Sequence, residues 1–274
     1  MNKLKRFLFN KGSSVAYAII TAVFTVVPED FFKCVKLKAD WQDMTSATVN
    51  RLIICVVVFL ISSLVYLAFR KKRKTATVSG NNYTIQIECG DLLDHPKGKT
   101  IINFDECFTT QVGDKPSDVK PDSVCGQYLK KNPIDNMQEL IDNAGIKPAK
   151  GKSQFKNQVR YEPGTIVPNG EFLLMAFAKL DKYGRGYLNY EDYLECLNTL
   201  WDQVDLYHGT CDVFMPILGS KITRFEKNLT QQELLDIIIF SYRLSSKRMK
   251  RPCKLHIVYQ PKEGFSVNNI SGVD

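Results

Sequence analysis

Hydrophobic side chains form one long, uninterrupted run in the first part of the chain. Residues 52–69 carry no charged side chain and are followed by five consecutive cations, Arg70 to Lys74. As an α-helix rising 1.5 Å per residue, this run is about 27 Å long, close to the roughly 30 Å hydrocarbon thickness of a bilayer. A span that meets anionic cytoplasmic lipid commonly ends in such a basic block. The pattern predicts a transmembrane helix over 52–69, and a buried core helix is the alternative.

A second, weaker apolar run covers residues 12–27 and follows a basic start. A cleaved signal peptide is the alternative to a first span, but no A-x-A-like site follows the run. The connection at 28–50 holds 4 acidic and 3 basic residues, whereas cations cluster outside both runs. Because the cytoplasmic flanks of membrane spans carry an excess of Lys and Arg, we expect both termini to lie in the cytoplasm. We therefore expect residues 1–74 to form a two-helix transmembrane hairpin.

Beyond residue 74 the apolar positions become short and periodic. After a polar stretch at 75–82, which reads as a linker, alternation at 83–89 indicates a half-buried strand. The remaining pattern predicts strands at 100–104, 171–178, 212–218 and 255–259 and helices at 133–144, 190–204 and after Thr230. Strands that alternate with helices predict one α/β domain over 75–274, with a mixed sheet that is largely buried.

Charge divides along the chain in the same place. Residues 1–74 hold 13 Lys/Arg and 4 Asp/Glu, a net charge of +9, whereas residues 75–274 hold 24 and 25, a net charge of −1. The basic character therefore belongs to the membrane segment, which argues against a nucleic-acid partner. Eight cysteines occur singly, without a CxxC pair, as expected in a reducing compartment and not in a disulfide framework or a zinc site.

Catalytic and metal-binding motifs are scarce. The segment Asp181 to Asp192 has the length of a calcium loop, but Tyr183 and Arg185 occupy its third and fifth positions, where oxygen ligands are needed. A glycine-rich turn is the better interpretation. The sequence contains no GxSxG, HExxH, GxGxxG or Walker loop, and no nucleophile has a local base partner. We expect neither catalytic residues nor a metal.

Three strand ends carry the remaining candidate chemistry. They are C-G-D-L at 89–92, I-I-N-F-D-E at 101–106 and P-I-L-G-S-K-I-T-R-F at 216–225. In α/β sheets, ligands gather at the carboxyl ends of strands, where the N–H groups of a turn can bind anions. Each signal is weak by itself, because a glycine or an aspartate after a strand usually marks only a turn.

Taken together, these strand ends resemble a macro domain, the ADP-ribose-binding α/β/α fold. With two preceding spans, the chain more closely resembles the membrane-anchored effectors of Thoeris anti-phage defence, on the stretches 160–169, 172–181 and 215–226. The resemblance implies a three-layer fold and an ADP-ribose-type signal made by a TIR-domain partner, ADP-ribose joined to an amino acid such as histidine. It implies no other cofactor.

The resemblance also implies which residues bind this ligand. Asp91 would accept the adenine amino group, and the Leu92 backbone would support the adenine. The loops after Asn103 and Leu218 would hold the ribose and the diphosphate, with Lys221 or Arg224 adding charge. The implied ligand-binding residues are Asp91, Leu92, Asn103, Phe104, Asp105, Leu218, Gly219, Ser220, Lys221, Thr223 and Arg224.

Two departures from the macro-domain pattern bear on activity. The first loop reads N-F-D-E-C-F-T-T where macro domains have N-A-A-N and a glycine run, and the second lacks S-T-G-x-[YF]-G. The sequence therefore favours a non-enzymatic receptor in the bacterial inner membrane. Ligand binding is expected to assemble this receptor into a homo-oligomer, which disrupts the lipid bilayer and stops growth. A membrane-anchored ADP-ribosyl hydrolase and a membrane-tethered scaffold are the alternatives.

Overall fold

The computed structural model describes residues 11–28, 30, 43–94, 98–220, 223–225 and 228–270, with the side chains of 11–13, 43–46, 70 and 71 excepted. Contacts between Cα atoms divide the chain into two compact units, Met1–Arg73 and Lys74–Asp274. The expected basic start at 1–10 and most of the connection between the apolar runs lie outside the described residues.

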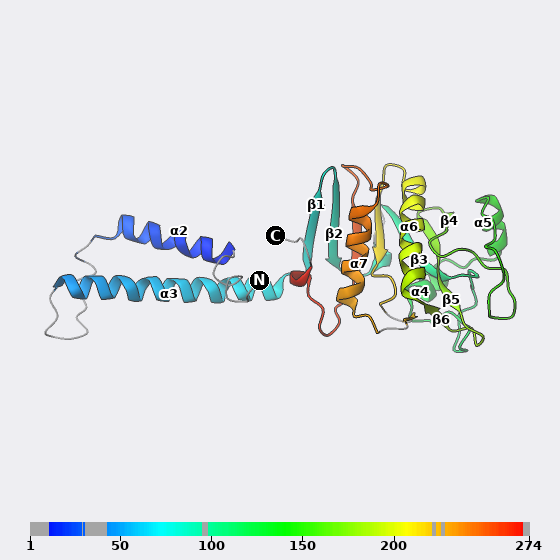
Figure 1. Ribbon diagram of the computed structural model, residues 1–274, viewed down its shortest axis with the longest axis horizontal. Coiled ribbons are helices and arrows are strands. Elements are labelled where there is room, and N and C mark those ends of the chain that lie inside the picture. Colours follow the sequence, from blue (N-terminus) through cyan, green and yellow to red (C-terminus); the bar gives the residue numbers. More distant parts are fainter. Residues whose placement is uncertain are drawn as a thin grey trace. The chain divides into compact units, whose positions relative to one another are not determined.

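The first unit contains two apolar helices that lie side by side (Figure 1), α2 (Lys11–Val26) and α3 (Asp43–Lys72). Ala16 of α2 is fully buried and Ala47 of α3 nearly so, as expected where small residues allow two helices to approach closely. Among the described residues, only the segment Ala47–Phe69 is long and apolar enough to cross a membrane, since the apolar part of α2 is the shorter Ser14–Val26. The two expected helices are present, but only one has the length of a span.

The second unit is built on a mixed sheet of nine described strands. In sequence they are β1 (Thr75–Gly80), β2 (Tyr83–Cys89), β3 (Gly98–Asp105), β4 (Ile166–Asn169), β5 (Phe172–Leu180), β6 (Gly186–Leu188), β7 (Asp212–Pro216), β8 (Arg224–Phe225) and β9 (Leu255–Tyr259). The order in the sheet is β1-β2-β9-β7-β3-β5-β6-β8, and β4 pairs with β5. Strands β2, β9, β7, β3 and β5 run parallel, so their carboxyl ends share one edge.

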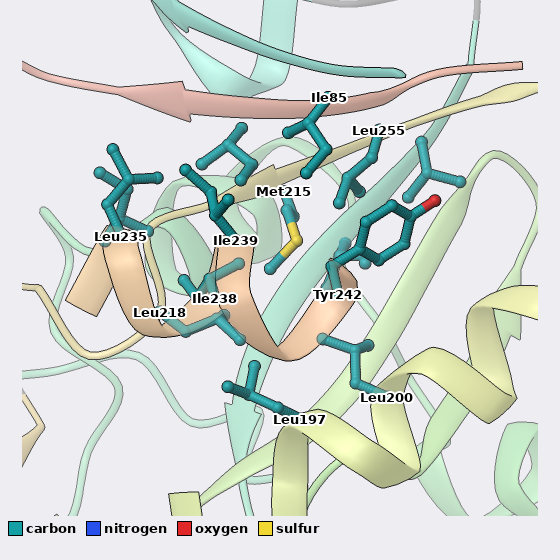
Figure 2. Packing of buried hydrophobic residues seen from close by; sticks show 14 of the residues in the cluster. Ile85, Leu197, Leu200, Met215, Leu218, Leu235, Ile238, Ile239, Tyr242 and Leu255 are labelled. Atoms are coloured by element: carbon teal, nitrogen blue, oxygen red, sulfur yellow. The ribbon is translucent and has the colours of Figure 1, made fainter. Parts of the chain in front are cut away.

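Helices cover both faces of this sheet. They are α4 (Val124–Lys131), α5 (Met137–Asn143), α6 (Tyr190–Tyr207) and α7 (Gln231–Leu244), with short 3-10 turns η2 (Leu92–Asp94) and η3 (Val267–Asn269). Buried side chains of α6 and α7 form one core with the sheet, whereas those of α4 and α5 form a second core on the opposite face. Figure 2 shows the first core, where Ile238 and Tyr242 of α7 meet Ile85 and Leu255 of the strands. The expected three-layer α/β/α fold with a mixed sheet is confirmed.

Local signals explain where the two long helices begin. The Asn189 side chain accepts a hydrogen bond from the Asp192 N–H at 2.7 Å and starts α6. Thr230 and Glu233 form a reciprocal capping box that starts α7, as predicted from the sequence. The indole N–H of Trp201 in α6 donates to the Ser241 hydroxyl in α7 at 2.8 Å, which joins the two helices.

Some of the predicted elements were wrong or missing. The expected polar linker at 75–82 is instead the edge strand β1, because Ala76 and Val78 alternate inward and Asn82, with φ of 59°, closes a two-residue turn to β2. Helix α5 begins later than the predicted 133–144, because Asn136 caps it. Helix α4 and the short strands β4, β6 and β8 were not predicted.

Candidate functional site

A cavity of about 590 Å³ opens at the carboxyl ends of the parallel strands. Its walls come from the segments that follow β2, β3, β7 and β9 and from the end of β5. Nine of the eleven residues predicted to bind ligand line it: Asp91, Leu92, Asn103, Phe104, Asp105, Gly219, Ser220, Thr223 and Arg224. The volume lies within the range of small-molecule sites, about 300–1,000 Å³.

The turn after β2 presents Asp91 to the cavity. The Gly90 N–H donates to the carbonyl oxygen of Tyr259 at 3.1 Å, which holds the ends of β2 and β9 together. One carboxylate oxygen of Asp91, Oδ1, accepts from the Leu93 N–H at 3.1 Å and starts η2. Leu92 is buried beneath this turn, in the second core. The turn therefore orients an exposed carboxylate at the cavity.

The end of β3 contributes a polar, a nonpolar and an acidic side chain. The Asn103 amide lines the cavity and has no hydrogen-bond partner in the described part of the chain. Phe104 is a packing residue, because the centre of its ring lies 5.9 Å from the centre of the Phe108 ring in the second core. Asp105 Oδ1 accepts from the N–H groups of Cys107 and Thr109 at 2.8 and 3.2 Å. Loss of hydration on burial nevertheless raises the pKa of Asp105 above its usual value.

The loop after β7 supplies a tight turn. Gly219 has φ of +79°, and a Cβ there would come within 2.5 Å of the Phe225 ring, so both conformation and space require glycine. Leu218, predicted to bind ligand, does not line the cavity. Its side chain is fully buried in the first core, and its carbonyl accepts from the Tyr193 hydroxyl at 3.3 Å. Lys221 lies outside the described residues.

One wall of the cavity was not predicted as part of the site. It consists of residues from the 116–127 segment, for which no helix or strand was predicted, and from the turn at 184–186. These two segments pack closely, because a Cβ on Gly184 would come within 2.6 Å of the Ser117 Cβ. The lysine and serine content of 116–127 was a signal, but only the tertiary structure brings this loop to the strand ends.

Arg185 is the cation that this wall adds. Its Nε donates to Asp181 Oδ2 at 2.8 Å, and its guanidinium lies 4.9 Å from the centre of the Tyr183 ring. Burial alone would raise the pKa of Asp181. Hydrogen bonds from the backbone and side chain of Arg185 nevertheless hold this pKa below its usual value. The beginning of the segment 181–192, which was compared above with a calcium loop, is thus a turn that positions an arginine at the cavity.

Charges of both signs face the cavity. Among the described residues, the basic ones are Lys120, Arg185, Arg224 and Lys262, and the acidic ones are Asp91, Asp105 and Asp118. Basic side chains suit phosphate groups, and carboxylates accept hydrogen bonds from amino or hydroxyl groups. A nucleotide carries both kinds of group. The arrangement can therefore bind a nucleotide-like ligand in one defined orientation.

Comparison with known proteins agrees with this geometry. Residues 85–260, more than half of the chain, match the family model described as Thoeris protein ThsA, Macro domain. The chain is also 28% identical over 202 residues to Thoeris protein ThsA of Bacillus amyloliquefaciens strain Y2, which covers 70% of this chain and 67% of that protein.

Solved macrodomains are more distant. A mutant macrodomain of Oceanobacillus iheyensis has a TM-score of 0.46 and 10% identity, with 69% of this chain and 91% of that chain covered. The macrodomain of Thermus aquaticus DarG has a TM-score of 0.39 and 14% identity, with 65% and 98% covered. On the family match to residues 85–260, the chain belongs to the Thoeris ThsA macro domain family.

Proposed function

We propose that this protein is a membrane-anchored receptor-effector of Thoeris anti-phage defence. Its macro domain binds an ADP-ribose-derived signal, ADP-ribose joined to an amino acid such as histidine, which a TIR-domain partner supplies. Binding assembles several copies in the bacterial inner membrane and disrupts the bilayer, so that growth stops. Both termini lie in the cytoplasm, and the apolar helices α2 and α3 form the membrane hairpin.

One observation carries the proposal: a ThsA-type macro domain has a cavity at its strand ends that is lined by Asp91 after β2 and by Gly219, Ser220, Thr223 and Arg224 after β7. The segment Ala47–Phe69 supports anchoring by its length and composition. The direct test is calorimetric titration of ADP-ribose, and separately of histidine-linked ADP-ribose, into the full-length protein in detergent. Absence of binding by both would reject the proposal.

The proposed role is binding without catalysis. The loop after Asn103 continues with Phe104, Asp105 and Glu106, and it lacks the glycine run on which de-ADP-ribosylation in macro domains relies. Asp105 instead holds its own loop through two backbone N–H groups. Incubation with an ADP-ribosylated protein separates the two functions. Release of ADP-ribose well above background would establish a hydrolase in place of a receptor.

Charge reversal at Arg224 is expected to weaken ADP-ribose binding about tenfold or more. The Arg224 side chain is exposed at the cavity, and β8 is held by its pairing with β6, so the cation is available to the diphosphate. A tenfold loss corresponds to about 1.4 kcal/mol, close to the lower end of the roughly 1.5–3 kcal/mol that a charged hydrogen bond contributes. Calorimetry on Arg224→Glu measures the loss.

Arg243→Glu is the matched control for this charge change, because Arg243 is exposed in the last turn of α7 and does not line the cavity. Wild-type affinity of Arg224→Glu would place Arg224 outside the ligand contact. An equal loss of affinity in Arg224→Glu and Arg243→Glu would indicate long-range electrostatics alone, and raising the salt concentration should then abolish it.

Ligand is expected to increase the mass of the protein–detergent particle. A hairpin of two helices encloses no pore, so membrane disruption requires several copies. To move an equilibrium between dispersed and assembled forms from 1:99 to 99:1, the ligand must favour the assembled form by about 5.5 kcal/mol. Light scattering on the solubilised full-length protein, with and without saturating ligand, measures the change. Tight binding at constant mass, with toxicity retained in cells, would contradict the assembly step.

A further inference from the structure

Strand β1 lies at one end of the sheet and pairs with β2 alone, in an uninterrupted antiparallel register (Figure 1). The side of β1 that faces away from β2 is an open edge. Because the turn between the two strands has two residues, Gly80 and Tyr83 beside it exchange hydrogen bonds, and such pairs recur at every second residue. Val78 therefore directs its N–H and C=O to β2, whereas Thr77 and Ser79 direct theirs to the open edge.

The backbone groups at this open edge have no partner in the described part of the chain. No hydrogen bond there reaches the N–H or the C=O of Thr77 or Ser79. The side chains of these two residues are exposed, whereas Ala76 and Val78 between and beside them are buried in the first core. The core thus holds β1 in place while its outer backbone groups are available to another strand.

β1 has none of the features that usually protect such an edge, which are charged side chains, a proline, a bulge or a very short strand. It contains six residues, and none of them is charged or a proline. The described strand at the other end of the sheet, β8, has only two residues, one of which is Arg224. The open edge of β1 is therefore suited to pairing with an added strand.

A second copy of β1 is complementary to this edge. When two copies run antiparallel about a two-fold axis at Thr77, that residue lies opposite its own copy, and Ser79 lies opposite Thr75 of the second copy. The exposed face then carries hydroxyl side chains opposite one another, and such cross-strand pairs stabilise a sheet. On the core face, Ala76 lies opposite Val78, so the two faces of the strand keep their separate characters.

The basic residues before β1 favour the antiparallel direction. Lys72, Arg73 and Lys74 directly precede the strand. In the antiparallel pair the two copies of Lys74 are about 20 Å apart along the strands, beyond the Debye length of about 8–10 Å, whereas a parallel pair would bring the basic residues side by side. Arg73 and Lys74 alone separate β1 from α3 in sequence, so copies anchored by α3 in one membrane would present their β1 strands at high local concentration.

We propose that two copies of this protein associate by antiparallel pairing of their β1 strands across a two-fold axis at Thr77. The sheets of the two copies then form one continuous sheet. The inference extends the assembly step of the proposed function by naming one interface, and it does not depend on which ligand the cavity binds.

Oxidative crosslinking of the full-length protein in detergent, with and without ADP-ribose, tests this register. In the proposed pair the Cα atoms of the two Thr77 residues are about 5.5 Å apart, within the range that a disulfide spans. The two Ser79 residues are about 14 Å apart along the strands, which is too far. Thr77→Cys should therefore form a dimer on a non-reducing gel. Ser79→Cys is the matched control and should not exceed the wild type, whose own cysteines set the background.

Blocking the open edge provides an independent measurement. Thr77→Pro removes the outward N–H but none of the bonds to β2, and proline is tolerated in an edge strand where its nitrogen faces outward. Light scattering should show the protein mass of the particle falling about twofold or more relative to the wild type. Thr77→Ala keeps the backbone donor and should retain the wild-type mass. If Thr77→Pro fails to fold, Thr77→Lys replaces it, because two like charges then meet at the axis.

The outcomes separate this interface from the proposed function. A Thr77→Cys variant that forms no dimer in either condition, or no more than Ser79→Cys, overturns the interface. A wild type that is monomeric with and without ligand, or a folded Thr77→Pro variant of wild-type mass, overturns it as well. Calorimetry on the same samples reports ligand binding separately. A wild type that does not bind the ligand overturns the proposed function, whereas a Thr77→Cys dimer would still establish the interface.

Discussion

Replacing Glu106 with leucine is expected to lower the free energy of unfolding of the α/β unit by about 3–5 kcal/mol, the usual cost of removing one partner from a buried charge pair. The Glu106 side chain is 3% exposed. Its Oε1 accepts from the Ser153 hydroxyl at 2.6 Å and from the Leu180 N–H at 3.1 Å, and Oε2 lies 3.6 Å from Arg160 Nη1. Leucine fills the space but removes the acceptor of the Ser153 hydroxyl and the Leu180 N–H and the buried carboxylate beside Arg160.

For a domain of this size, that loss corresponds to a fall of roughly 10 °C in the midpoint of thermal unfolding. The measurement is the intrinsic fluorescence of the full-length protein on heating, to which the buried Trp201 responds. Glu106→Gln should fall between wild type and Glu106→Leu, because glutamine keeps an acceptor oxygen for Ser153 and Leu180 but loses the charge opposite Arg160.

Glu162→Gln provides the control for this experiment. Glu162 is 4.0 Å from Nη2 of the same arginine, but its side chain is 57% exposed, and exposed pairs contribute little. Its unfolding midpoint should match that of the wild type. If Glu106→Leu also unfolds at the wild-type temperature, the buried network does not stabilise the end of β3, and the positioning of Asp105 must come from its own loop contacts.

The elements with strong local signals could be predicted from the sequence. Strands β2 and β9 have the predicted bounds, because alternation at 83–89 and a short apolar run at 255–259 each fit one structural period. Helix α7 begins where its capping box indicated. These signals reside within a few residues, so no knowledge of the tertiary structure was needed to interpret them.

Elements whose stability comes from distant partners were misread. β1 looks like a linker because Thr75, Thr77 and Ser79 are polar, and only its pairing with β2 makes it a strand. Helix α4 has eight residues with few apolar positions, and it is fixed by Tyr128, which is fully buried and contacts Phe172 with ring centres 4.8 Å apart. Tertiary packing overrides weak local preference in both cases.

The residues of the candidate site also divide into those that local sequence signals could place and those that only the tertiary structure places. Residues at strand ends, such as Asp91 and Asn103, could be placed at one cavity because parallel strands end at one edge. Leu218 was included because the macro-domain resemblance places the loop that follows it at the ligand, but its side chain is buried in the first core. Arg185 was missed, since its position at the cavity depends on how the turn at 184–186 packs against the 116–127 segment.

Replacing Asp91 with alanine is expected to weaken ADP-ribose binding ten- to hundredfold without unfolding the protein. One carboxylate oxygen holds the turn through the Leu93 N–H, and in the described part of the chain the other, Oδ2, has no partner. A charged acceptor that meets a ligand donor contributes about 1.5–3 kcal/mol, which corresponds to the stated change in affinity. The lost turn contact is exposed, so stability should change little.

Titration calorimetry of ADP-ribose into the full-length protein measures this effect, with the unfolding midpoint recorded for the same sample. Asp94→Ala is the matched control, because Asp94 ends the same 3-10 turn and is exposed but does not line the cavity. Asp91→Asn separates charge from geometry, since asparagine can keep the contact with Leu93. A folded Asp91→Ala variant with wild-type affinity would remove Asp91 from the site, and the donor of the ligand would then have to meet Asn103 instead.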